Sequence, residues 1–272
     1  MKSLAELKDE QKAEVENLRA AAVRLVRDRL QPQERIIGVL LAGSVARGDA
    51  RSGPYGLYID IVVLAEGRND VDLKELFGPS IEPGVPKHCV KVEDIAVAFE
   101  LTTTKDLIEI RMKPEAEIYA RQESIILYDK TGFLQSWKDT AFTITDEQRS
   151  KRALHWFFRY FYLVNNYRIE KWKHRSAWLQ LCQNGNEAIE CYCNFLFCIN
   201  GWFIPRKDWL VYLTCELKNI APGHELILEE LYSTVADEQG QTQRFAKLWE
   251  IFKWMSAYCK ENKWIDLPEP KV

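Results

Sequence analysis

The chain lacks the features that would place it in a membrane or on a nucleic acid. Its 272 residues contain no uncharged apolar run of about 18 residues, the length that a membrane-spanning helix needs. It also lacks a basic excess, since the formal net charge is −3, and general nucleic-acid binders normally carry one. The N-terminal segment has no apolar core of the signal-peptide kind. We therefore expect a cytoplasmic protein with neither a membrane nor a nucleic acid as partner.

The chain also lacks the pattern of paired cysteines. It has seven cysteines, an odd number, and no Cys-x-x-Cys pair, which argues against a disulfide framework and against a structural zinc site. Reduced thiols in a cytoplasm are the natural interpretation. Hydrophobic residues make up 47% and charged residues 28%, as in soluble globular proteins.

The composition changes partway along the chain and predicts two domains. All nine tryptophans lie at or beyond Trp137, and six of the seven cysteines lie at or beyond Cys182. Before that point, apolar runs alternate with glycine and proline; from Thr145 onward the pattern is helical. We expect an α+β protein with a sheet-and-helix domain at 1–140 and an all-helical bundle at 141–272.

Apolar runs and alternation predict the strands of the first domain. Residues 36–41 (IIGVLL) and 59–64 (IDIVVL) are continuous apolar runs, typical of buried strands. In residues 90–101 apolar and polar residues alternate, which predicts one further strand. A last, short strand is predicted within 123–132. Helices are predicted near the N-terminus, at 70–77 and 102–112, and then in a long aromatic stretch through 152–175 and at 176–199, 207–219, 224–236 and 241–262.

A Gly-Ser turn follows the first predicted strand. Gly43 has no side chain, so a ligand can approach its backbone closely, and Ser44 would begin a short helix. Backbone N–H groups at such a turn bind anions, phosphates above all, and Arg47 adds positive charge. A tight turn without a ligand is the simpler interpretation of this pair when it is taken alone.

Carboxylates from two other strands are expected beside this turn. Asp60 lies in the apolar run at 59–64. The strand predicted over 90–101 contains Asp94 and Glu100, both on one predicted face. Such a cluster next to bound phosphates is what Mg²⁺ needs to hold a nucleoside triphosphate. The alternative for Asp94 and Glu100 is an ordinary surface position.

At these residues the sequence resembles a known family. GSVARGDARSG followed by IDIVVL is similar to the signature of the DNA-polymerase-β-like nucleotidyltransferases, and in particular to their small bacterial and archaeal branch, which includes antibiotic nucleotidyltransferases. Two later segments, ILYDKTG at 126–132 and CINGWFIPRKDWL at 198–210, resemble parts of the same proteins. The residues that match the signature are Gly43, Ser44, Ala46, Arg47, Gly48 and Asp60.

The resemblance implies a polymerase-β-like domain followed by a helical domain. It implies transfer of a nucleoside monophosphate, AMP in the first instance, from ATP or another nucleoside triphosphate to a hydroxyl of a small-molecule acceptor, and it leaves a homodimer open. Mg²⁺ is the expected cofactor. The implied roles are nucleotide binding for Gly43, Ser44 and Arg47, metal binding for Asp60 and Asp94, and catalysis for Asp60, Asp94 and Glu100.

One position departs from the family pattern. The Ser-Asp of the family's Ser-Asp-x-Asp corresponds to Leu57 and Tyr58, after a longer loop, GPYGLY. A phenol with a pKa of about 10 is a poor Mg²⁺ ligand at neutral pH. Either another acid, namely Asp94, Glu100 or Asp49, takes the role of the missing one, or turnover is weak or absent. The alternatives are a degenerate protein that binds a nucleotide or a partner without turnover, and an enzyme of toxin–antitoxin type that nucleotidylates proteins.

Overall fold

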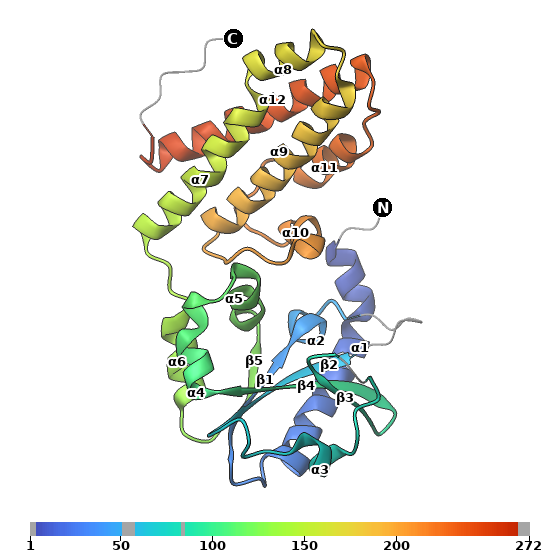
Figure 1. The fold of residues 1–272 in the computed structure, drawn as a ribbon, viewed down its shortest axis with the longest axis vertical. Coiled ribbons are helices and arrows are strands. Elements are labelled where there is room, and N and C mark those ends of the chain that lie inside the picture. Colours follow the sequence, from blue (N-terminus) through green and yellow to red (C-terminus); the bar gives the residue numbers. More distant parts are fainter. Residues whose placement is uncertain (1–3, 51–57, 83–84, 266–272) are drawn as a thin grey trace. The chain divides into compact units, whose positions relative to one another are not determined.

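The computed structural model describes residues 4–50, 58–82 and 85–265. The chain forms two compact units, residues 1–143 and 144–272 (Figure 1). In the described residues, all five strands belong to the first unit, and the second unit contains helices only. The prediction of an α+β fold with a helical C-terminal part is therefore confirmed.

The sheet of the first unit has the strand order β3-β4-β2-β1-β5. β2 pairs in parallel with β4 and antiparallel with β1, and the two outer pairs, β3 with β4 and β1 with β5, are antiparallel. The apolar runs at 36–41 and 59–64 form β1 and β2, as predicted, and β5 lies within the predicted segment 123–132. The bounds are β1 Ile36–Ala42, β2 Tyr58–Ala65, β3 His88–Val92, β4 Ile95–Thr103 and β5 Ile125–Asp129.

The single strand predicted over 90–101 is wrong. This segment folds back on itself as a hairpin, and Glu93 and Asp94 form the turn between β3 and β4. Their φ angles are 48° and 66°, in the left-handed region that reverses the chain. No Gly or Pro marks this turn. Its trace in the sequence is that two polar residues, Glu93 and Asp94, stand side by side and shift the alternation by one residue.

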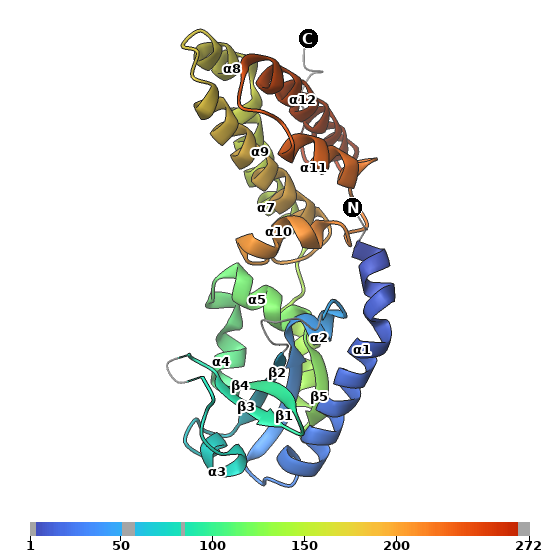
Figure 2. The same ribbon diagram turned by 90° about the vertical axis from the view of Figure 1, so that its right-hand side faces the viewer.

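One face of the sheet is apolar and packs on the N-terminal helix α1, Leu4–Leu25. Ile59, Ile61 and Val63 of β2 lie in one buried cluster with Val15 and Ala22 of α1, and Figure 2 shows α1 running beside the sheet. Because strand side chains alternate, Tyr58 and Asp60 point to the opposite face. The other helical segments of this unit are a π-helical turn at Val26–Leu30, α2 Gly43–Arg47, α3 Leu73–Phe77, α4 Thr104–Ile108, a 3₁₀ turn at Glu109–Met112, α5 Glu115–Gln122 and α6 Phe133–Ala141.

The second unit is built around α9, Trp178–Ile199, whose C-terminal half is buried. The aromatic stretch that sequence analysis treats as one helix is two helices, because Asn165 ends α7 and caps α8 with its side chain. None of the helices in the described residues is both long and apolar enough to cross a membrane. The remaining bounds are α7 Asp146–Val164, α8 Asn166–Lys173, α10 Lys207–Thr214, α11 His224–Tyr232 and α12 Glu238–Glu261.

Candidate functional site

The Gly-Ser turn and Asp60 meet at the end of β1. Ala42 pairs with Asp60 across the antiparallel β1–β2 ladder, so Gly43 begins α2 directly beside this carboxylate. Gly43 has a φ of 68°, and a methyl group at this position would lie 2.3 Å from Asp60 Oδ2. Only glycine allows both this backbone conformation and this approach. The structure thus brings together Gly43, Ser44 and Asp60, as the sequence leads us to expect.

Lys87, which no sequence pattern singles out, contacts Asp60 at the same place. Lys87, in the segment before β3, places its ammonium Nζ 2.6 Å from Asp60 Oδ1. The side chain of Lys87 is 42% exposed and that of Asp60 is 25% exposed, so the pair borders solvent. Lys87 follows a proline-rich stretch of sequence and belongs to no recognisable motif, so the sequence offered no signal for it.

Tyr58 occupies the position of the missing acid and remains a neutral phenol. Its hydroxyl donates a hydrogen bond to Glu82, and this bond, together with partial burial and the charge of Glu82, raises the pKa of Tyr58 to about 12. The phenol is therefore protonated at neutral pH and is a hydrogen-bonding group rather than a ligand for a cation. The preceding loop, residues 51–57, lies outside the described residues.

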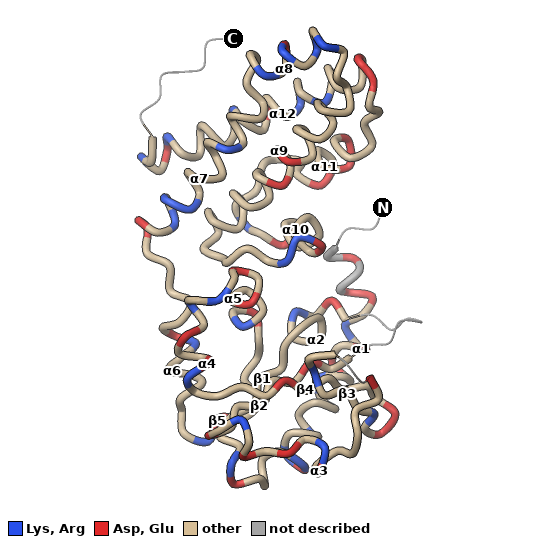
Figure 3. Tube along the Cα trace, viewed as in Figure 1, with Lys and Arg blue, Asp and Glu red and all other residues tan. Residues whose placement is uncertain are grey.

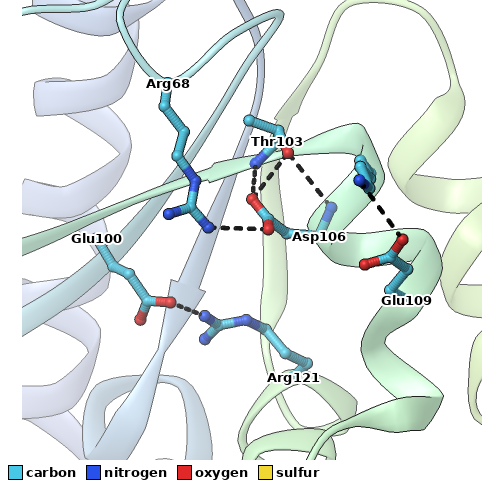
Figure 4. Close-up of polar contacts among 7 residues, drawn as sticks. Arg68, Glu100, Thr103, Asp106, Glu109 and Arg121 are labelled. Carbon is cyan, nitrogen blue, oxygen red and sulfur yellow. Dashed lines mark hydrogen bonds and ion pairs between the residues drawn. The ribbon is translucent and has the colours of Figure 1, made fainter.

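Of the two further acids predicted for the site, only Glu100 lies on its face of the sheet. Asp60 pairs with Ala98 on β4, and Glu100 is two residues further along the same face. Figure 4 shows the Glu100 carboxylate turned toward Arg121 of α5, to which it is hydrogen-bonded. Arg121 was not among the predicted site residues.

Asp94 lies away from this face. It belongs to the β3–β4 turn, beyond the pairing of Tyr58 with Ala96 at the start of β2. Its side chain is 93% exposed and lies 2.8 Å from Lys91, and the hydrogen bond from Lys91 lowers the pKa of this carboxyl. The structure does not join Asp94 to Asp60, because the hairpin carries it out of the strand.

Arg47 points into the protein and not toward the turn that it follows. Its guanidinium donates to Asp49 at 3.2 Å and to Glu123 at 2.7 Å, and its side chain is 12% exposed. Burial opposes the charge of Arg47, but Glu123 and Asp49 outweigh it and raise the pKa of the arginine. Burial in turn raises the pKa of Glu123. These contacts tie α2 to the end of α5 and engage both Arg47 and Asp49 in ion pairs.

The described residues do not fit the Mg²⁺ site that the resemblance implies. They contain no group of three or more His, Cys, Asp or Glu side chains placed to hold a metal ion. Mg²⁺ needs several oxygen ligands in an octahedral arrangement, with one or two protein carboxylates bridging it to phosphates. Here Asp60 is paired with Lys87 and Glu100 with Arg121, so each candidate ligand already has a cation beside it.

A separate cavity of about 670 Å³ lies within the second unit. Two ion pairs, Arg159–Glu187 and Lys207–Glu190, line it together with Trp156 and Tyr232. Charges of both signs are interspersed along the described trace of both units (Figure 3). The cavity offers a second place where a small polar molecule would fit.

Comparisons with known proteins give only a distant likeness. No protein-family model matches the chain, and no curated protein sequence matches it. Among solved structures, it is similar to a nucleotidyltransferase-like protein from Exiguobacterium sibiricum 255-15, with 12% sequence identity and a TM-score of 0.42, over 90% of this chain and 77% of that chain. A likeness this weak identifies neither the site nor the activity of this protein.

Proposed function

We propose that the first unit binds a nucleoside triphosphate on the Asp60 face of its sheet, and that the protein transfers a nucleoside monophosphate slowly to a hydroxyl of a small-molecule acceptor. AMP from ATP is the first case to test. The observation that carries the proposal is the contact of Asp60 with the Gly43-Ser44 turn across adjacent strands. This arrangement joins the most specific parts of the sequence signature in one place.

The transfer needs few groups. The acceptor hydroxyl oxygen forms a bond to the α-phosphorus, the bond between that phosphorus and the bridging α–β oxygen breaks, and pyrophosphate leaves with the electron pair. Glu100 lies on the same face of the sheet, hydrogen-bonded to Arg121 through Oε1, and would accept the hydroxyl proton. Gly43 and Ser44 would position the phosphates, and positioning would supply most of the acceleration.

The rate is expected to be low because one acid is missing. Tyr58 cannot supply negative charge while it is protonated, and Asp60 is neutralised by Lys87. Without a pair of free carboxylates, the site cannot hold Mg²⁺ against its own hydration as a two-carboxylate site does. The charge that develops on the leaving pyrophosphate is then poorly compensated.

The second candidate is a protein that binds the nucleotide without any turnover. The Lys87–Asp60 ion pair favours it, because the acid that the reaction would use is already engaged. In that case the bound nucleotide is a ligand and not a substrate.

Radiolabelled nucleoside triphosphates, incubated with the protein and a pool of hydroxyl-bearing small molecules, distinguish the two candidates. Slow formation of a nucleotidylated product with release of pyrophosphate supports transfer. Binding without product supports the second candidate, and the absence of any binding contradicts both.

The variant Gly43→Ala tests the location of the nucleotide. The added methyl group strains the backbone and displaces Asp60, so we expect the affinity for ATP to fall at least about tenfold. Gly132→Ala is the matched control, since Gly132 also has a positive φ, 75°, but has no atom within 4 Å of an added methyl group. Equal losses in the two variants would mean that the turn is not the binding site.

A further inference from the structure

Lys87 lies on the sheet face between the two acids of the proposed site. His88 pairs with Phe99 in the antiparallel β3–β4 ladder, so Lys87, one residue earlier, comes opposite Glu100. Asp60 approaches from the other side of β4, where it pairs with Ala98. Because Ala98 has only a methyl group, the ammonium of Lys87 can pass over it and contact Asp60 at 2.6 Å.

Both acids of this face are therefore neutralised by side chains of the protein itself. Lys87 contacts Asp60, and Arg121 contacts Glu100. Arg121 is largely buried, with a side chain 13% exposed, whereas Lys87 is 42% exposed. Of the two cations, Lys87 is the one that a ligand in solution can reach.

We infer that this site takes a nucleoside polyphosphate without a divalent ion, and that the ammonium of Lys87 is the cation that contacts its phosphates. The inference rests on the proposed function, which places the nucleotide on this face. An ammonium group has three donors, and the contact with Asp60 uses one of them. The remaining N–H groups, on a side chain that borders solvent, suit the phosphate oxygens, for which lysine acts as a point charge.

A divalent ion at the same place would have to displace Lys87. The ion would give up strongly held water molecules and gain only one protein carboxylate, that of Asp60. Lys87 would at the same time lose its counter-ion. A polyphosphate that arrives without the ion meets a carboxylate already screened by an ammonium. The arrangement therefore favours the metal-free ligand over its Mg²⁺ complex.

The experiment measures the ATP affinity of the full chain by calorimetric titration at constant ionic strength, once with excess EDTA and once with MgCl2. For the unmodified protein we expect affinity in EDTA at least equal to that in Mg²⁺. Lys87→Met should weaken binding in EDTA about tenfold or more, and Lys87→Arg, which keeps the charge, should retain most of it.

Lys91→Met is the matched control. Lys91 lies in β3 and also pairs with an aspartate, Asp94, but this aspartate belongs to the hairpin turn and not to the face that carries Asp60. Its loss should leave the affinity for ATP unchanged. Circular dichroism of each variant checks that the fold is retained.

Asp60→Asn separates this inference from the proposed function. If Lys87 holds the phosphates, removing the negative charge beside it should maintain or increase affinity in EDTA. If a metal bridges Asp60 to the phosphates, binding should require Mg²⁺ and Asp60→Asn should abolish it, which would overturn the inference and leave the proposed function standing. No ATP binding in either buffer would overturn both.

Discussion

At the scale of single residues, charge compensation decides what this sheet face can bind. Asp60 and Glu100 carry the negative charges that the sequence suggested for a metal, yet each faces a cation from a distant part of the chain. Gly43 and Asp60 were predictable because they belong to one motif. Lys87 and Arg121 were not, since a loop and a helix bring them to the site and only the tertiary fold defines that proximity.

Arg47 is predicted to be a structural residue. Replacing it by Met leaves Asp49 and Glu123 buried without their common cation, and an unpaired buried charge costs about 3–5 kcal/mol. We expect Arg47→Met to lower the free energy of unfolding by that order, measured by urea denaturation. Arg47→Lys should lose less, because it keeps the charge. A loss below about 1 kcal/mol for Arg47→Met would contradict this role.

His224 is predicted to make the second unit less stable in acid. The residue is 2% exposed, and its ring nitrogens Nδ1 and Nε2 lie 3.0 Å from the Tyr192 hydroxyl and 2.8 Å from the Thr214 hydroxyl. Burial lowers the pKa of His224 to about 4. Because Thr214 donates to Val211, Nε2 of the histidine carries the proton and Nδ1 accepts from Tyr192. The folded state thus requires the neutral ring.

The sign of the pH effect follows from this lowered pKa. Above the pKa of about 6.5 that histidine has in the unfolded chain, His224 is neutral in both states and the folded state keeps its full stability. As the pH falls from there toward 4, the histidine binds a proton in the unfolded chain but not in the folded one. The free energy of unfolding should drop by up to about 3 kcal/mol over this window. His224→Gln should lose this part of the pH dependence; an unchanged profile would contradict the assignment.

At the scale of elements, the sequence predicted the limits of helices and strands where neighbouring residues alone set those limits. The helical pattern from Thr145 onward predicted the start of α7, and the structure has a capping box there, with both hydrogen bonds between Thr145 and Gln148. The β3–β4 hairpin and helices α5 and α6 were missed, because their limits depend on turns and tertiary packing that leave no periodic pattern in the sequence.

The cap of α7 offers a quantitative test. Thr145→Ala removes the side-chain acceptor for the N–H of Gln148, which lies 3.2 Å away. We expect a loss of about 1 kcal/mol in the free energy of unfolding, measured by urea denaturation. Thr145→Ser keeps the oxygen and should lose only a few tenths of that amount. Equal losses in both variants would mean that the methyl group of Thr145, and not its cap, stabilises the helix.

At the scale of the whole molecule, each unit has its own buried core. The first is organised by the sheet and α1, the second by α9 with α7 and α12. Eight of the nine tryptophans and six of the seven cysteines belong to the second unit, so the composition of the chain differs between the two units. Sequence alone indicated the fold class and the Gly43–Asp60 contact, but not the ion pairs that modify the site.

Two cores predict two thermal transitions. Differential scanning calorimetry of the full chain should resolve one transition that shifts with Arg47→Met and another that shifts with His224→Gln. The reason is that each substitution removes contacts within a single unit. One transition that moves equally with both substitutions would show that the units unfold as one.

Hydrogen–deuterium exchange of the full chain with and without ATP tests the central claim, that the Asp60 face binds the nucleotide. We expect ATP, in EDTA, to slow exchange in peptides that cover the end of β1 with α2, in β2, and around Lys87. Peptides of the second unit need not change. Slowed exchange confined to α7, α9 and α10, which line the 670 Å³ cavity, with none in β1, α2 or β2, would contradict the account.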